Sequence, residues 1–300
     1  MSMRIGIDLG GTKTEIVVLD GSDTIRLRRR VPTPGVYEDV VAIMAGLVRQ
    51  AEAELGDTGS VGVGIPGSLS PRDGRVRNAN SLILNGRALD NDLAVALGRP
   101  VRVSNDANCL ALSEAADGAG VGHRTVFAVI LGTGVGGGLV VDGRLLEGPN
   151  RVTGEWGHVP LPWMTAAEFP GPRCWCGLDG CIETVLCGPA LAADWKGAGA
   201  RDAAGIEQAA ADGDARAEAA LARYVSRLAR ALAQVVNIAD PDAIVLGGGA
   251  SNLARLYAEV PGMMAPYIFG DSHDVALLRA KHGDSSGVFG AARLWDRAGG

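Results

Sequence analysis

Apolar and polar positions along the chain alternate in a pattern that is repeated once. Short apolar runs at residues 4–10 and 14–19 flank one glycine-rich turn, and runs at 125–131 and 139–141 flank a second, at 132–138. Apolar runs of this length that are bounded by glycine are typical of strands rather than of helices. The sequence therefore predicts two strand–turn–strand units, one in each half of the chain.

Amphipathic helices are expected between and after these units. The clearest runs from Leu221 to Val235 and ends near Ile238, because its apolar residues recur every three or four positions and form one face. The other expected elements are helices near 37–55, 89–97 and 107–117, strands at 60–65, 101–104 and 243–246, and a short helix that begins within 284–287. Mixed strands and helices with a repeated opening unit favour an α/β fold.

We expect this fold to have two related lobes around a cleft. The glycines at 118, 120 and 122 mark a natural boundary between them. The smaller N-terminal lobe is then residues 1–117, joined by the closing segment 285–300, which packs back on it. The larger C-terminal lobe is residues 118–284.

Composition and charge narrow the functional classes. The chain has 300 residues, is 47% hydrophobic and has a formal net charge of −6, so it can fill two cores and has no electrostatic attraction to nucleic acid. The basic run 28–30 lies in a segment that alternates apolar and polar residues, which predicts the solvated face of a strand. No segment approaches the roughly 18 apolar residues of a membrane span. Because no signal peptide precedes the first strand, we expect a cytoplasmic protein with no membrane partner.

The two glycine-rich turns differ from the best-known nucleotide-binding motifs. The segment 6–14 lacks the spacing of a P-loop, and the G-x-G-x-x-G match at 132–137 precedes a strand where a dinucleotide site needs a helix. Taken alone, each glycine-rich segment can be explained as an ordinary tight turn. Because a third glycine run, 247–249, also follows a strand, a nucleotide across the cleft is the better interpretation. The residues expected to contact it are Gly10, Gly11, Thr12, Lys13, Gly132, Thr133, Gly134, Gly247 and Gly248.

Two carboxylates and an amide are candidates for chemistry. Asp8 ends the first strand and is placed to hold Mg²⁺ against phosphates. Asn105 and Asp106 lie between a strand and a helix, where either residue can simply cap the helix. Alternatively, Asp106 is a general base that accepts a proton from a substrate hydroxyl, and Asn105 binds a sugar hydroxyl.

A histidine and three cysteines have the spacing of a metal site. His158, Cys174, Cys176 and Cys181 supply four ligands, which is the set of a closed, structural Cys₃His zinc site. The alternative, unrelated buried thiols, suits only Cys109 and Cys187. The cluster lies in a zinc loop, 155–183, that begins and ends with a glutamate. Three tryptophans, 156, 163 and 175, either pack around the metal or wall the substrate.

Taken together, these motifs resemble the ROK family of sugar kinases over about residues 4–295. The motifs that carry the resemblance are Asp8-Leu9-Gly10-Gly11-Thr12-Lys13, 64–67, 105–108, 132–134, 154–158 and the pattern Cys174-x-Cys176-Gly177-x-x-Gly180-Cys181-Ile182-Glu183. The resemblance implies an actin-like, ribonuclease-H-like ATPase fold with two lobes. It also implies Mg-ATP-dependent phosphorylation of a hexose and one structural Zn²⁺.

The resemblance also assigns roles by position. It makes Asp106 the catalytic base, the glycine turns the phosphate loops and 247–249 the nucleoside side. His158 would bind both zinc, with the three cysteines, and a sugar hydroxyl. The residues implied to contact the sugar are Asn80, Asn105, Asp106, Glu155, His158 and Glu183.

The acceptor sugar is inferred from shorter segments of the chain. Segments 67–71, 78–81, 84–86, 160–164 and 281–287 are most similar to bacterial fructokinases of this family, which phosphorylate the 6-hydroxyl of fructose. N-acetylglucosamine kinase ranks second and glucokinase third. A non-catalytic, sugar-sensing regulator is the alternative of another class. A homodimer is compatible with the sequence but is not readable from it.

Overall fold

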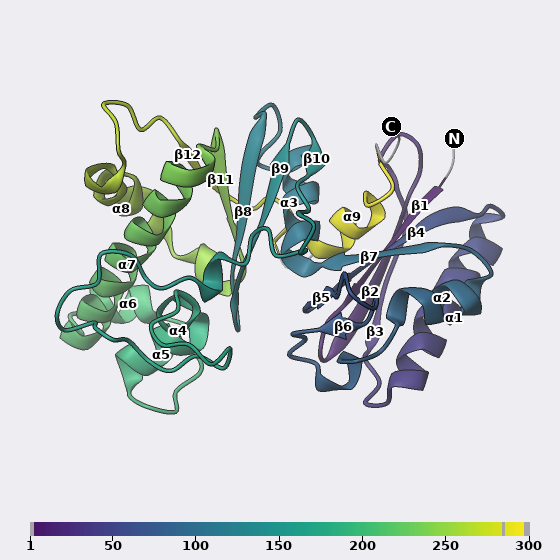
Figure 1. Cartoon of the computed structure of the whole chain (residues 1–300), viewed down its shortest axis with the longest axis horizontal. Helices are drawn as coiled ribbons and strands as arrows, with labels where there is room; N and C mark the ends of the chain where they lie inside the picture. Colours follow the sequence, from purple (N-terminus) through teal and green to yellow (C-terminus); the bar gives the residue numbers. More distant parts are fainter. Residues whose placement is uncertain (1–2, 284–285, 297–300) are drawn as a thin grey trace.

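The computed structural model describes residues 3–283 and 286–296, and within them the chain forms two five-stranded sheets of the same design (Figure 1). The first sheet has the order β3-β2-β1-β4-β7 and the second β10-β9-β8-β11-β12. In each sheet the first three strands of this order are antiparallel and the next two are added in parallel. The repeated strand–turn–strand unit expected from the sequence is therefore confirmed as β1–β2 and β8–β9.

The helices and strands occupy the following residue ranges, in chain order. Those of the first half are β1 (Met3–Leu9), β2 (Lys13–Leu19), β3 (Ile25–Pro32), α1 (Tyr37–Leu55), β4 (Gly59–Ile65), β5 (Ser68–Leu69), β6 (Val76–Arg77), η1 (Leu82–Leu84), α2 (Leu89–Leu97), β7 (Val101–Asn105) and α3 (Asp106–Ala116). Those of the second half are β8 (Thr125–Leu131), β9 (Val135–Val141), β10 (Arg144–Leu145), η2 (Trp156–His158), α4 (Glu183–Leu186), α5 (Gly188–Lys196), α6 (Ile206–Ala211), α7 (Ala215–Ala239), β11 (Ala243–Gly247), η3 (Gly249–Asn252), α8 (Ala254–Met264), η4 (Ala265–Tyr267), β12 (Ala276–Arg279) and α9 (Ser286–Ala292). The mixed α/β fold with two sheets is thus confirmed.

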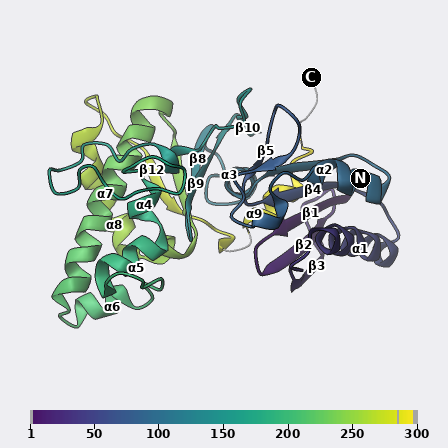
Figure 2. The same ribbon diagram turned by 60° about the horizontal axis from the view of Figure 1, so that its bottom comes forward.

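Helices cover the outer sides of the two sheets and fill the space between them. Figures 1 and 2 place α1 and α2 outside the first sheet, and α7 and α8 outside the second. In both views α3 and α9 lie in the centre. The helix α3 packs against β8 and β9, whereas α9 packs against β1, β4 and α3. The centre of the molecule is therefore a helix pair held between two sheets.

Glycines allow this central packing to be close. A Cβ atom built on Gly290 of α9 would lie 1.7 Å from the carbonyl oxygen of Cys109 in α3. A Cβ on Gly62 of β4 would lie 2.0 Å from the carbonyl oxygen of Ala291. Backbone contacts of this kind leave no room for a side chain, which explains two of the glycines that the sequence pattern left without a role.

The longest helix buries the face that its sequence predicts. In α7, Leu221, Val225, Leu228 and Leu232 are each at most 1% exposed and belong to the core of the second half. The side chain of Asp214 caps the helix by accepting hydrogen bonds from the N–H groups of Arg216 and Ala217. The helix continues through the expected end near residue 238.

The basic run on β3 is a solvated face, as expected. Leu27 points into the core and is 7% exposed, while the arginines on either side pair with carboxylates. Arg28 and Arg30 both contact Glu15, whose side chain is 4% exposed, and Arg29 pairs with Glu54. The three arginines of the run therefore pair with carboxylates of β2 and α1.

The second glycine-rich turn is shorter than the sequence suggests. Only 132–134 form the turn, and β9 already begins at Val135. A Cβ on Gly137 would lie 2.8 Å from a ring carbon of Trp156, and one on Gly138 would lie 2.7 Å from the carbonyl oxygen of Ala107. The glycines after the turn therefore belong to a strand on which a ring and a helix pack, and the expectation of a turn through 138 was wrong.

The predictions about two helices, the last helix and the boundary between the lobes have different outcomes. The helices near 37–55 and 89–97 have the predicted bounds. Residues 284–285, where the last helix was expected to begin, lie outside the described residues, and α9 starts at Ser286. The division into residues 1–117 with 285–300 and residues 118–284 stays a prediction, because α3, just before its boundary, packs on the second sheet. Across residues 3–283 and 286–296, no helix combines the length and the apolar character that a membrane crossing requires.

Candidate active site

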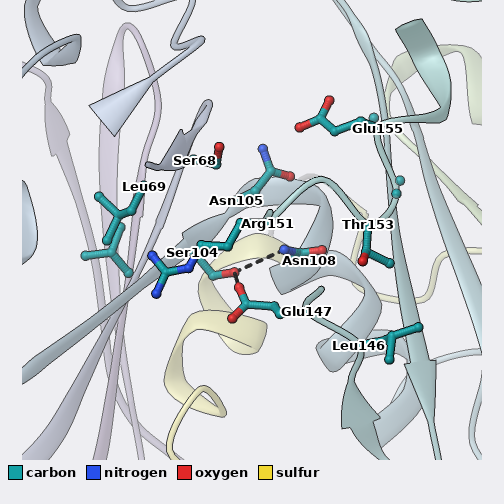
Figure 3. Close-up of a pocket in the computed structure, with 14 residues that line it drawn as sticks. Ser68, Leu69, Ser104, Asn105, Asn108, Leu146, Glu147, Arg151, Thr153 and Glu155 are labelled. Carbon is teal, nitrogen blue, oxygen red and sulfur yellow. Dashed lines mark hydrogen bonds between the residues drawn. The ribbon is translucent and has the colours of Figure 1, made fainter. Parts of the chain in front are cut away.

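A pocket opens between the two sheets, and polar side chains from both halves of the chain line it (Figure 3). Ser68, Asn105 and Asn108 come from the first half, while Glu147 and Glu155 come from the second. In Figure 3, Ser68, Asn105 and Glu155 surround the upper part, and Asn108 and Glu147 lie below them. A pocket of this character, with several convergent hydrogen-bonding groups, suits a polyhydroxylated ligand.

The strand β7 and the helix α3 position Asn105 and Asp106. The side-chain oxygen of Asn105 accepts a hydrogen bond of 2.8 Å from the N–H of Ala107, and its amide donates one of 3.1 Å to the carbonyl oxygen of Gly67. Asn105 is therefore the N-cap of α3, as one of the two interpretations held. It also lines the pocket, so the capping role and the proposed contact with a sugar are compatible.

Asp106 is the first residue of α3 and has a raised pKa. Its carboxylate accepts a hydrogen bond of 2.8 Å from the N–H of Ala107. Burial raises the pKa of Asp106 to about 6, and the negative charge of Glu155 adds to the effect, while the hydrogen bond from Ala107 opposes it. A carboxylate with a pKa close to neutrality is well suited to accept a proton from a hydroxyl group.

Asp8 lies where the first sheet meets α9. A Cβ on Gly287 of α9 would be 3.2 Å from a carboxylate oxygen of Asp8, so helix and carboxylate are in close contact. The pKa of Asp8 is raised to about 7, first by burial and then by the charges of Asp106 and Glu15, against the effects of Lys13 and Arg30. Neighbouring carboxylates that repel one another and are oxygen ligands fit a divalent cation such as Mg²⁺.

The glycine turns β1–β2 and β8–β9 lie at corresponding ends of the two sheets, the lower ends in Figure 1. Each turn is closed by one backbone hydrogen bond of 3.0 Å, from Gly10 to Lys13 and from Gly132 to Gly134. Of the residues expected to contact phosphates, Gly11, Thr12, Lys13 and Thr133 are exposed, and Gly10, Gly132 and Gly134 are half-buried. Both turns are thus tight and also accessible, so phosphate binding stays a prediction for them.

A second cavity begins at the turn of the second sheet. It is lined by Gly132 and Thr133, by Gly249 and Ala250 of η3, and by segments 188–191 and 201–208. Its mixture of glycine backbone, aliphatic side chains and polar groups suits a nucleoside next to a phosphate turn. The lining segments between 188 and 208 were not found from the sequence, because they carry no motif and come together only when α5 and α6 pack beside the turn.

The expected nucleotide contacts Gly247 and Gly248 do not line this cavity. A Cβ on Gly247 would lie 3.1 Å from the side chain of Leu110, and Gly248, whose φ is 81°, packs against the backbone of Leu131. These two glycines let β11 and η3 approach β8 and α3. The next two residues of the chain, Gly249 and Ala250, are the ones that face the cavity.

Of the residues expected to bind a sugar, some line the pocket and others lie outside it. Glu155 lines the pocket, and burial raises its pKa, against the opposing effects of His158 and Arg77. Glu183 lies beside the turn of the second sheet, where its carboxylate accepts a hydrogen bond of 2.9 Å from the N–H of Val135. Asn80 is exposed in the loop after β6 and does not line the pocket.

The predicted zinc ligands come together. The ligand atoms of His158, Cys174, Cys176 and Cys181 all lie within 4.8 Å of one another. Two of the distances, from Cys174 Sγ to His158 Nδ1 and from Cys176 Sγ to Cys181 Sγ, are 3.6 Å. A tetrahedral zinc ion with Zn–S bonds of about 2.3 Å requires sulfurs about 3.8 Å apart. The cluster therefore fits Zn²⁺, and its four ligands leave no open position for a bound water.

A buried ion pair fastens the zinc loop to α7. Arg230, whose side chain is 3% exposed, donates hydrogen bonds of 2.9 and 2.8 Å to the two carboxylate oxygens of Glu168. It also donates one of 2.8 Å to the carbonyl oxygen of Trp163. The guanidinium group lowers the pKa of Glu168 to about 2 despite its partial burial. This pair could not be predicted from the sequence, because its members are more than sixty positions apart.

Known proteins resemble the chain over nearly its whole length. The family described as the ROK family matches residues 4–298. An N-acetyl-D-glucosamine kinase of Escherichia fergusonii is 39% identical over 299 residues, which cover 97% of this chain and 99% of that protein. The crystal structure of a ROK hexokinase from Thermus thermophilus superposes with a TM-score of 0.84 at 33% identity and covers 97% of this chain and 96% of the other. A ROK family glucokinase from Streptomyces griseus, solved with glucose and AMPPNP, gives a TM-score of 0.78 at 28% identity, covering 98% and 99% of the two chains.

Removing one cluster cysteine should remove the metal. We expect the purified wild-type protein to carry one zinc ion per chain and Cys176→Ser to carry much less, because three ligands no longer close the site. The variant should also melt at a lower temperature, since metal binding contributes to the stability of the loop. Metal analysis by inductively coupled plasma mass spectrometry and a thermal melt measure the two effects.

The matched control is Cys187→Ser, a half-buried cysteine outside the cluster. It should keep its zinc. Wild-type protein purified without chelators that holds far less than one zinc ion per chain would contradict the assignment.

Proposed function

The chain belongs to the ROK family and is an ATP-dependent sugar kinase, and we propose that its acceptor is the 6-hydroxyl group of N-acetyl-D-glucosamine. The observation that carries the choice of acceptor is the 39% identity, over almost the full length of both chains, to a protein named for this activity. Fructose, which ranks first on the motifs alone, has no such support, and none of the three relatives above is named a fructokinase. The second-ranked acceptor therefore replaces the first in this proposal.

Asp106 is the catalytic base of the proposed reaction. It accepts the proton of the acceptor hydroxyl as that oxygen forms a bond to the γ-phosphorus and the bond from phosphorus to the bridging oxygen of ADP breaks. It lies at the N-terminus of α3, where the N–H of Ala107 holds one of its oxygens, directly after Asn105, which lines the pocket. The raised pKa strengthens it as a proton acceptor while it stays ionised at neutral pH.

Residues of both halves bind and orient the acceptor. Asn105, anchored through its hydrogen bonds to Ala107 and Gly67, presents a fixed amide to the pocket. Glu155 faces it from the other side, and His158 donates from the ring nitrogen that does not bind zinc. Fixed donors and acceptors of this kind bring the reacting hydroxyl into line with the phosphate, which is a large part of the catalysis of phosphoryl transfer.

The nucleotide occupies the opposite part of the cleft in this proposal. The nucleoside lies in the cavity beside Gly249 and Ala250, and its phosphates point toward the turns 10–13 and 132–134. Asp8 would hold the Mg²⁺ ion, which neutralises charge on the phosphates when it is bound. Closure of the two lobes would exclude water from the γ-phosphate, as a kinase requires if it is not to hydrolyse ATP.

A panel of acceptors tests the proposed substrate. We expect the kcat/KM for N-acetylglucosamine to be at least about tenfold above the values for glucose, mannose and fructose, because a pocket that pairs with an acetamido group leaves its polar atoms unpaired with a plain hydroxyl. Initial rates of ADP release with Mg-ATP give the ranking, and a reaction without sugar measures background hydrolysis. A clear preference for fructose would reverse the choice of acceptor while leaving the kinase assignment in place.

The pH dependence tests the base. Asp106 acts only when it is deprotonated, and its pKa of about 6 predicts that kcat/KM falls as the pH drops through this value. At pH 5 the value should be about tenfold below its plateau, since only about one tenth of the molecules carry the ionised base. Rates measured from pH 4 to 8 with saturating Mg²⁺ show this fall in kcat/KM. A rate constant that is flat down to about pH 4, the range of an ordinary aspartate, would contradict the role of this environment.

A further inference from the structure

Trp175 is an exposed tryptophan in contact with two residues of the acceptor site. It lies between two zinc ligands, Cys174 and Cys176, and is 65% exposed. Its ring meets that of His158 edge to face, with the ring centres 4.9 Å apart at an angle of 89°. Its indole N–H donates a hydrogen bond of 2.6 Å to Oε1 of Glu183. An indole that is mostly in solvent is therefore held by one aromatic contact and one charged acceptor.

The carboxylate of Glu183 connects this indole to the turn of the second sheet. Its other oxygen, Oε2, accepts a hydrogen bond of 2.9 Å from the N–H of Val135, the first residue of β9. A Cβ on Gly134 would lie 2.7 Å from this oxygen, so the carboxylate packs directly on the turn backbone. The glycine at 134 is thus explained by the glutamate, and neither can move far without the other.

Two other tryptophans nearby lack this link. Trp156 is buried, and its N–H donates a hydrogen bond of 2.9 Å to the carbonyl oxygen of Gly136. Trp163 belongs to the same loop as Trp175 and is 50% exposed, but its ring packs on Tyr267 at 5.0 Å. Packing explains Trp156 and Trp163. It does not explain Trp175, whose contacts go to His158 and Glu183.

We propose that Trp175 is a positioning residue that holds the Glu183 carboxylate and thereby couples the acceptor site to the phosphate turn. The chain of contacts runs from the indole N–H to one oxygen of Glu183, and from its other oxygen to the N–H of Val135, directly after the turn 132–134. The carboxylate keeps lone pairs for a sugar hydroxyl, since each of its two oxygens accepts one bond in the structure. The inference rests on the proposed function only in that Glu183 contacts the acceptor.

This linkage predicts mutual effects of the two substrates. A sugar that binds Glu183 orders the carboxylate, and with it the N–H of Val135 and the turn that receives the phosphates. By thermodynamic linkage, the factor by which sugar raises the affinity for nucleotide equals the factor by which nucleotide raises the affinity for sugar. The zinc ligands on both sides of Trp175 hold its backbone, so the metal loop is part of the same coupling.

Trp175→Phe removes the N–H and keeps an aromatic ring against His158. We expect the KM for the acceptor to rise about tenfold, which corresponds to the loss of one hydrogen bond to a charged group. The ratio of ADP affinities with and without sugar, measured by titration calorimetry with Mg-ADP, should fall toward one. Zinc content should stay at one ion per chain, which separates lost positioning from a collapsed loop.

Trp163→Phe is the matched control, because it makes the same exchange on the same loop without touching Glu183 or His158. It should keep the wild-type KM and the wild-type ratio of ADP affinities. We expect sugar to change the tryptophan fluorescence of the wild type. This change should be retained in Trp163→Phe and largely lost in Trp175→Phe. Glu183→Gln keeps the shape of the side chain but offers only one acceptor oxygen. It should also lower the ratio of ADP affinities with and without sugar. Combined with Trp175→Phe, it should add little further loss.

The proposal is overturned if Trp175→Phe matches Trp163→Phe in acceptor KM and in the ratio of ADP affinities. A wild-type protein that binds Mg-ADP equally well with and without its sugar would overturn it as well. The titrations use whichever sugar gives the highest kcat/KM in the acceptor panel. A preference for a sugar other than N-acetylglucosamine therefore contradicts the proposed acceptor and leaves this test intact.

Discussion

Close backbone packing of α9 against α3 and the first sheet holds the site together. No side chain separates the two helices where Gly290 faces the carbonyl oxygen of Cys109, and the backbone at Gly287 lies directly against the carboxylate of Asp8. Asp106 stands at the start of α3, close enough for its charge to act on Asp8. Burial, and then the charge of Asp106, raises the pKa of Asp8. In the proposed reaction, one acid of this pair holds the cation and the other activates the hydroxyl.

The two sheets supply different parts of the proposed site. The first sheet supplies Asp8, and its strand β7 leads into Asp106, the proposed base. The second supplies the turn 132–134 and the cavity beside η3, while the zinc loop between β10 and α4 carries Glu155 and His158. Because each sheet contains the repeated β-hairpin, both glycine turns lie at corresponding ends of the two sheets. In the proposed reaction, the phosphoryl group is transferred where the two halves of the molecule meet.

Local patterns allowed much of this arrangement to be predicted from the sequence. The zinc ligands could be found because their spacing along the chain is short, and α1 and α2 could be bounded because amphipathic spacing is a local property. The start of β9 could not, because Gly137 and Gly138 are strand residues only where Trp156 and α3 pack on them. The cavity proposed for the nucleoside was missed for a similar reason: its segments, 188–191 and 201–208, are joined only by the packing of α5 and α6. The fold was thus predictable from the sequence, and the walls of the cavities were not.

The role of Asp106 is the central claim, and the variant Asp106→Asn tests it most directly. Asparagine keeps the shape of the side chain and cannot accept the proton of the acceptor hydroxyl. The measurement is a pair of values on this variant: sugar affinity by titration calorimetry and kcat by ADP release with Mg-ATP. The account predicts an affinity within a few-fold of the wild type and a kcat reduced by about 10² to 10⁴. A variant that keeps most of its kcat would contradict it.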